Sequence, residues 1–79
     1  MKSLAIETIQ MKTKVCESFG IYLSKMFPDE KVKEVAYRYD CDTNEEYADI
    51  TYQNGYTKSA NISCDSGLAI IADVCKALY

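Results

Sequence analysis

The strongest constraint on the fold of this chain is an asparagine-glycine pair, Asn54-Gly55, between two stretches in which apolar and polar residues alternate. Alternation with a period of two is typical of half-buried strands, and Asn-Gly between two such stretches predicts a β-hairpin. A two-residue loop would turn the apolar residues of the two strands to opposite faces, because a shift of one position moves every side chain across the sheet. A three-residue loop, 53–55, with Gly55 in the left-handed region, brings them to one face.

The three-residue loop fixes the register that we expect for strands 46–53 and 56–64. Pairs on one face are mostly apolar and pairs on the other are polar: Tyr52 with Tyr56, Ile50 with Lys58 and Ala48 with Ala60 on the first, Thr51 with Thr57 and Asp49 with Ser59 on the second. Lys58 then points inward, and an inward charge is one way in which an edge strand discourages pairing with a further strand. We therefore expect 56–64 to be an edge strand.

Two helices are predicted, one near each end of the sequence. Apolar residues recur at helical spacing from Leu4 to Phe27, and Pro28 ends this helix because the residue before a proline avoids the helical region. The second helix follows Asp65 or Ser66, either of which is a good N-cap. Its apolar residues form two adjacent faces, which we expect to contact two different elements: Leu68, Ile71, Ala72, Cys75 and Leu78 on one, Ile70, Val74 and Ala77 on the other.

Residues 31–40 supply the remaining strand. They alternate in the manner of a half-buried strand, with Val35, Tyr37 and Tyr39 on the apolar side. The economical arrangement is an antiparallel meander with both helices on one face, where the last helix packs against the sheet and the first helix together. We therefore expect an α+β fold of order αβββα, a three-stranded antiparallel meander with both helices packed on one face, forming a single domain of residues 1–79.

Two polar residues interrupt the apolar face of the first helix. Thr8 and Lys12 project near the middle of that face, whereas Ile6 and Ile21 fall outside it. Two interpretations follow. In one, the helix overhangs its sheet and forms a homodimer through exposed apolar residues, Leu4, Ile6, Ile9 and Met11. In the other, Lys12 extends its aliphatic stem over the edge of an ordinary core.

The composition argues against several kinds of chemistry. The chain has no histidine, which removes the usual general base and a common zinc ligand. Its four cysteines, Cys16, Cys41, Cys64 and Cys75, are widely spaced and form no CxxC pair, so neither a disulfide framework nor a zinc site is favoured. No stretch has the pattern of a secretory signal or a membrane helix. We expect a cytoplasmic, non-enzymatic protein with no cofactor, no bound metal and no membrane contact.

Residues 40–49 hold five carboxylates and no basic residue: Asp40, Asp42, Glu45, Glu46 and Asp49. The segment begins like a calcium-binding EF-hand loop, but its sixth residue is Glu45 instead of glycine and its twelfth is Thr51 instead of glutamate. The chain through Arg38 has seven basic and five acidic residues, a net charge of +2, and the rest has two basic and seven acidic residues, a net charge of −5. This polarity disfavours direct binding of nucleic acid and favours a protein partner with a basic surface.

The element order, the acidic segment, the Asn-Gly turn and the closing helix GLAIIADVCKALY resemble small acidic proteins of phages and mobile elements, including anti-CRISPR proteins. The resemblance implies an inhibitor that presents an acidic loop to the DNA-binding groove of a CRISPR nuclease. We therefore expect a non-enzymatic protein-binding module whose binding residues are Asp40, Asp42, Glu45, Glu46, Tyr47 and Asp49. The alternatives are a small structural or self-associating protein that dimerises through the first helix, and an enzyme that uses a metal ion or paired carboxylates.

Overall fold

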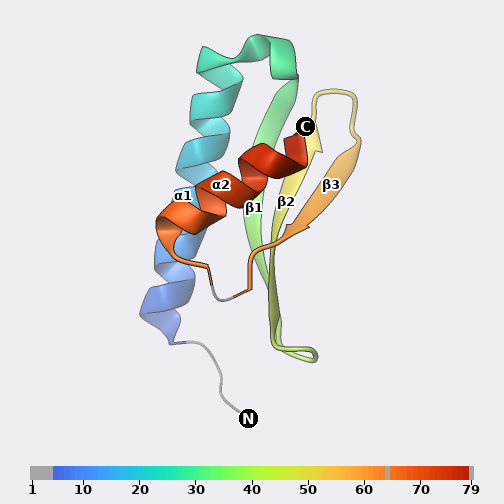
Figure 1. Ribbon diagram of the computed structural model, residues 1–79. Coiled ribbons are helices and arrows are strands. Elements are labelled where there is room, and N and C mark those ends of the chain that lie inside the picture. Colours follow the sequence, from blue (N-terminus) through green and yellow to red (C-terminus); the bar gives the residue numbers. More distant parts are fainter. Residues whose placement is uncertain (1–4, 64, 79) are drawn as a thin grey trace.

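The computed structural model describes residues 5–63 and 65–78 and has the expected order of elements (Figure 1). These are α1 (Ile6–Met26), a 3₁₀ helix η1 (Pro28–Glu30), β1 (Val32–Asp40), β2 (Glu45–Tyr52), β3 (Thr57–Asn61) and α2 (Gly67–Leu78). The strands form one antiparallel sheet in the order β1-β2-β3, and both helices lie on the same face of it. The predicted αβββα fold is confirmed. Neither of the two described α-helices is long and apolar enough to cross a membrane.

The β2–β3 hairpin has the register that the sequence predicts. The paired residues are Ala48 with Ala60, Asp49 with Ser59, Ile50 with Lys58 and Thr51 with Thr57. At the loop, the N–H of Tyr52 donates to the carbonyl of Tyr56 over 2.8 Å. Gly55 has a φ of 91°, in the region where a residue with a Cβ is strained. The three-residue loop is therefore confirmed, and Gly55 is the residue that permits it.

β3 is an edge strand, as expected, and its inward-pointing lysine contacts α2. The ammonium group of Lys58 donates a hydrogen bond to the carbonyl oxygen of Ala77, in the last turn of that helix. The last carbonyl oxygens of a helix receive no hydrogen bond from an N–H of the same helix, and they carry partial negative charge. A cation placed near them is therefore stabilising. One side chain thus ties the end of α2 to β3.

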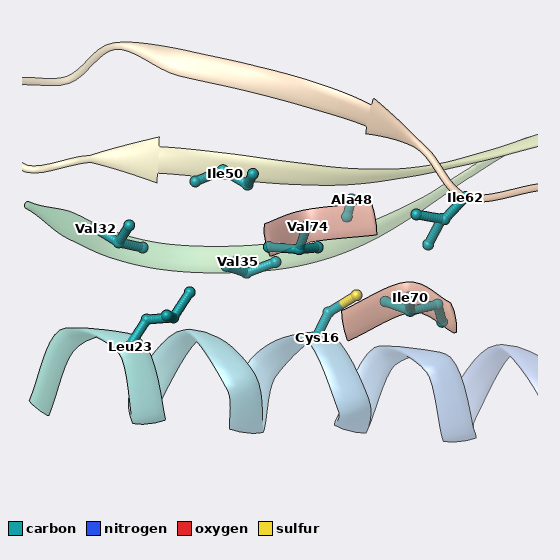
Figure 2. Close-up of a cluster of buried hydrophobic side chains, with 9 residues drawn as sticks. All are labelled: Cys16, Leu23, Val32, Val35, Ala48, Ile50, Ile62, Ile70 and Val74. Carbon is teal, nitrogen blue, oxygen red and sulfur yellow. The ribbon is translucent and has the colours of Figure 1, made fainter. Parts of the chain in front are cut away.

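A single hydrophobic core lies between the sheet and the two helices (Figure 2). Nine buried side chains form it within the described ranges: Cys16 and Leu23 from α1, Val32 and Val35 from β1, Ala48 and Ile50 from β2, Ile62 after β3, and Ile70 and Val74 from α2. Both helices need this one apolar sheet face to bury their stripes, which is why they lie on the same side.

Two details of the core differ from the sequence prediction. α2 buries Ile70 and Val74, whereas Leu68, which was expected on a covered face, is 82% exposed. In β1, a bulge between Val32 and Glu34 shifts the alternation of side chains, so that Val32 is buried together with Val35. The bulge therefore adds a core residue that strict alternation does not predict.

α1 lies so close to β1 that only glycine fits at the point of contact. A Cβ built on Gly20 would be 2.6 Å from the backbone nitrogen of Val35, a distance that real Cβ atoms essentially never show. The flanking residues Cys16 and Leu23 are buried on the same side of the helix. Gly20 therefore sets the distance between α1 and the sheet.

Replacing Gly20 by alanine tests this close approach. The added methyl group would overlap the backbone of β1, so we expect Gly20→Ala to lower the free energy of unfolding by about 1–3 kcal/mol. Gly67→Ala is the matched control, because a Cβ there would make ordinary contacts, 3.6 Å from Val15 and 3.8 Å from Met11, and alanine favours a helix. Urea denaturation followed by circular dichroism measures both variants. Equal stabilities would contradict the packing described for Gly20.

Candidate protein-binding site on the acidic hairpin

The hairpin of β1 and β2 carries the acidic segment to one end of the molecule (Figure 1). Its turn, residues 41–44, includes Asn44 in the left-handed region, with a φ of 60°. The N–H of Asp42 donates to Oδ1 of Asp40 over 3.0 Å, and the hydroxyl of Tyr39 donates to Oδ1 of Asn44. Asp42 is exposed and Asp40 is half-buried. Local hydrogen bonds thus fix the tip that displays these two carboxylates.

Arg38 and Asp49 form an ion pair on the outer face of the sheet, away from the helices. The Nε of Arg38 lies 2.8 Å from Oδ2 of Asp49, and a second guanidinium nitrogen lies 3.3 Å from Oδ1. Ser59 on β3 donates to the same Oδ1 over 2.7 Å. The hydrogen bond from Arg38 is the main cause that holds the pKa of Asp49 below its usual value. The charge of Asp49 is therefore largely compensated within the protein.

Tyr47 is held between a cation and a carboxylate on the same outer face. The guanidinium carbon of Arg38 lies 4.5 Å from the centre of the Tyr47 ring, which is within the range of a cation–π contact. The Tyr47 hydroxyl donates to Oε2 of Glu45 over 3.2 Å, and the side-chain amide of Asn61 donates to the same oxygen over 2.6 Å. Burial, followed by the hydrogen bond to Glu45, raises the pKa of Tyr47. Tyr47 and Glu45 are therefore already ordered without a partner.

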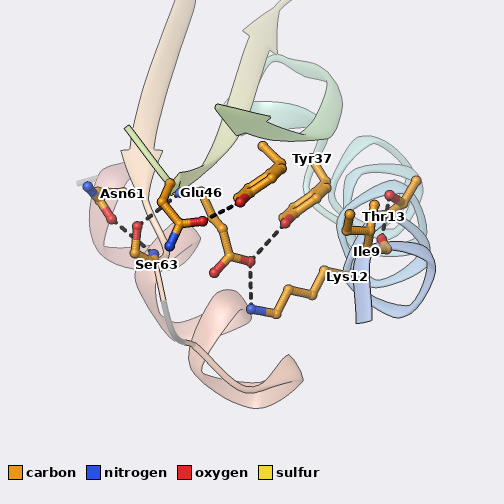
Figure 3. A network of polar contacts seen from close by, with 9 residues as sticks. Ile9, Lys12, Thr13, Tyr37, Glu46, Asn61 and Ser63 are labelled. Atoms are coloured by element: carbon orange, nitrogen blue, oxygen red, sulfur yellow. Dashed lines mark hydrogen bonds and ion pairs between the residues drawn. The ribbon is translucent and has the colours of Figure 1, made fainter. Parts of the chain in front are cut away.

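Glu46 points to the opposite side of the sheet, into the interior (Figure 3). Its Oε1 lies 2.6 Å from the ammonium nitrogen of Lys12 on α1, and each of the two residues is 4% exposed. The hydroxyl of Tyr37 donates to the same oxygen over 2.8 Å, and the N–H of Glu46 donates to Oγ of Ser63 over 2.9 Å. Burial and the Glu46 hydrogen bond raise the pKa of Tyr37 well above its usual value. The result is a buried polar cluster that joins α1, β1 and β2.

This cluster corrects the predictions made for Glu46 and Lys12. Glu46 was expected on the exposed acidic surface, but it is buried and cannot reach a partner there. Two positions were expected for Lys12: on a helix face that the sheet does not cover, or at the edge of the core with its charge in solvent. Lys12 is instead buried and forms an ion pair. The sequence contains a pattern from which the ion pair between Lys12 and Glu46 could have been predicted. Lys12 and Glu46 each occupy an apolar position, one on the helix face and the other on the side of β2 that carries Ala48 and Ile50.

The apolar residues proposed for a dimer at the beginning of α1 are unevenly placed. Ile6 is 68% exposed and Met11 is 44% exposed, whereas Ile9 is half-buried. Leu4 lies outside the described residues. The first turns of α1 therefore display two large apolar side chains.

Similarity to other proteins does not help to define this site. Comparisons of the chain with protein-family models, with curated proteins and with solved structures gave no match. Within the described ranges 5–63 and 65–78, no group of three or more cysteine, aspartate or glutamate side chains is arranged to hold a metal ion. The properties of the acidic hairpin therefore have to be inferred from its own geometry.

The buried pair can be tested by removing one charge or both. We expect Lys12→Met to lower the free energy of unfolding by about 3–5 kcal/mol, because the charge of Glu46 remains buried without its cation. The double variant Lys12→Met with Glu46→Leu should lose less than the two single variants combined, since no unpaired charge remains. Thermal unfolding followed by circular dichroism measures these changes, with Lys14→Met, at an exposed position, as the control. Additive losses would contradict a coupled pair.

Proposed function

We propose that this protein is a non-enzymatic protein-binding module that presents its acidic hairpin to a basic surface of another protein. The observation that carries the proposal is the set of acidic and aromatic residues at the tip and on the outer sheet face: Asp40, Asp42, Glu45, Tyr47 and Asp49. No lysine or arginine stands between Arg38 and Lys58, so the tip has no cation of its own. Complementary charge accelerates the encounter of two proteins and favours the correct partner.

The order within the hairpin supports this proposal. A side chain that is already fixed loses less conformational entropy on binding than one that is free. Tyr47 is fixed by Arg38 and Glu45, and tyrosine and arginine are among the residues that contribute most to protein interfaces. Asp40 and Asp42 supply negative charge beside this anchor. The hairpin thus combines an ordered aromatic contact with an acidic tip.

The partner that suits this surface is a protein with a basic site, such as a protein that handles nucleic acids. A CRISPR nuclease is one candidate, because the sequence resembles anti-CRISPR proteins and because a DNA-binding groove is basic. Nucleic acid itself is a poor ligand, since affinity for it depends on contacts between cations and phosphates. Arg38, a cation on this face, is already paired with Asp49.

Neutralising the tip tests the charge requirement. The triple variant Asp40→Asn, Asp42→Asn, Glu45→Gln keeps the acceptor oxygens used by the turn and by Asn61 and removes three charges. We expect its affinity for a fluorescent oligolysine peptide to fall about tenfold, from roughly 0.5 kcal/mol for each charge. Fluorescence anisotropy at low and at physiological salt measures the affinity.

The control variant is Glu7→Gln, Glu17→Gln, Asp29→Asn, which removes the same number of charges from exposed positions elsewhere. It should bind the peptide as the unaltered protein does. An equal loss in both triple variants would show that net charge alone attracts the peptide and would contradict a site on the hairpin.

A DNA-cleavage assay with a panel of CRISPR nucleases tests the candidate partner. If the protein leaves cleavage unchanged with every nuclease, CRISPR nucleases are excluded as partners. The oligolysine peptide assay then decides whether the hairpin is a binding site.

A second candidate function is self-association through the first turns of α1. The exposure of Ile6 and Met11 favours it, because large apolar side chains on a surface often mark contact sites. If this candidate is right, light scattering will give the mass of a dimer, and Ile6→Gln with Met11→Gln will give the mass of a monomer. A monomer at high protein concentration would dismiss the candidate.

A further inference from the structure

α2 has two apolar faces, and only one of them is buried in the core. Ile70 and Val74, on the first face, are 1% and 0% exposed, whereas Leu68, on the second, is 82% exposed. Ile71 and Cys75 follow Leu68 on this second face and are half-buried. Residues three, four or seven positions apart lie on the same side of a helix. Within the described part of the chain, an apolar stripe of α2 is therefore left without a full cover.

α1 has an apolar stripe of its own beside that of α2. Its members follow one side of the helix at spacings of three and four: Val15, Phe19, Tyr22 and Met26. Tyr22 is 48% exposed and Met26 is 61% exposed. The ring of Tyr22 contacts two others, with its centre 6.2 Å from that of Phe19 and 5.8 Å from that of Phe27. Because ring pairs at these distances attract each other, the exposed Tyr22 ring is already ordered in the single chain.

The two stripes border a groove between the helices. The beginning of α2 contacts α1, since a Cβ on Gly67 would lie 3.6 Å from Val15, and the two helices diverge from there (Figure 1). Two adjoining hollows lie between them and form the α1–α2 groove, whose lining includes Phe19, Tyr22, Ile71 and Leu78. A continuous apolar surface of this kind often marks a site of contact with another molecule.

The two ends of the α1–α2 groove carry opposite charges. Lys14 borders the first hollow and Glu30 borders the second. Tyr22 borders both hollows, with Lys14 eight residues before it and Glu30 eight residues after it. A twofold axis near Tyr22 would therefore place Lys14 of each copy opposite Glu30 of the other. The groove is thus complementary to itself in charge, which favours a second copy of this chain as its occupant.

We propose that two copies of this chain associate through the α1–α2 groove and form a twofold-symmetric dimer. The two α1 helices lie antiparallel across each other, with the Tyr22 rings near the axis and each Leu68 side chain covered by the other copy. The outer face of the sheet, with Tyr47, stays accessible because the helices lie on the opposite face. The dimer goes beyond the proposed binding function of the hairpin and does not depend on it.

The size of the helical face predicts a dimer of moderate affinity. α1 has 21 residues and is therefore about 31 Å long, and two helices packed side by side are about 20 Å wide. Such a face offers about 600 Å² per copy, at the lower limit of stable interfaces, which bury about 1,200–2,000 Å² in total. We therefore expect dissociation in the micromolar range, so the association has to be measured over a range of concentrations.

Sedimentation equilibrium of the full chain from about 1 μM to about 1 mM tests the proposal. We expect the mass to rise from that of a monomer to that of a dimer. Leu68→Gln with Tyr22→Gln should raise the dissociation constant about hundredfold, because a twofold interface loses each apolar contact twice. Ile6→Gln with Ile21→Gln is the matched control, at exposed positions outside the groove, and should change the constant by less than about threefold. Circular dichroism checks that each variant is folded.

Exchanging the charges at the two ends tests the twofold arrangement. Lys14→Glu places like charges opposite each other, as does Glu30→Lys, and each should raise the dissociation constant about tenfold. The double variant should recover the lost affinity, because opposite charges face each other again. Lys14 and Glu30 lie at opposite ends of the groove, so this recovery reports a contact between copies.

Three results would overturn the proposal. The first is a monomeric mass at every concentration, which would leave the α1–α2 groove to a different protein. The second is a dimer that Leu68→Gln with Tyr22→Gln weakens no more than the control variant does, which would place the contact elsewhere. The third is a charge exchange that fails to restore the association, which would contradict the twofold arrangement.

Discussion

The buried ion pair between Lys12 and Glu46 is the interaction on which the arrangement of this small fold depends. It joins a residue near the beginning of α1 to the middle strand of the sheet, and Tyr37 and Ser63 bind to Glu46 from two further segments. The desolvation of two charges offsets much of their attraction, so such a pair adds little net stability over an apolar pair. A register of α1 on the sheet that separated the two residues would leave a buried charge without its partner, which is strongly destabilising.

The alternation of side chains along β2 places the residues that contact the core on one face and the residues of the proposed binding site on the other. Glu46, Ala48 and Ile50 point inward and hold the helices, whereas Glu45, Tyr47 and Asp49 point outward and form the ordered acidic face. Neighbouring glutamates in one sequence thus have different roles. A binding surface on the outer face can change without disturbing the core, provided that its substitutions stay on the outward positions.

The sequence was sufficient to predict the order of elements and the register of the β2–β3 hairpin. These features follow from local rules. Pro28 ends a helix, and the apolar pattern selects the loop that brings Ile50 and Ala48 to the same face as Ala60. Gly55 supplies the positive φ that this loop needs. The sequence also indicated that Lys58 faces inward on an edge strand, although not that it binds the end of α2.

The remaining features depend on contacts between segments far apart in the chain. The need for glycine at position 20 arises from the backbone of Val35, and the burial of Val32 arises from a bulge that no local pattern marks. The shared charge of the acidic segment predicts a single surface, whereas the strand divides its residues between two faces. Register and charge had to be considered together to place Glu46 opposite Lys12.

The different surroundings of two cysteines give the protein a natural pair of chemical probes. Cys41 is exposed in the turn of the acidic hairpin, whereas Cys16 is buried in the core, where burial and then the neighbouring Glu17 raise the pKa of its thiol to about 11. A thiol must be both accessible and deprotonated to react with an alkylating reagent. A dye attached to Cys41 would therefore lie at the acidic tip of the native protein. The rate at which Cys16 is alkylated would report how often the core opens.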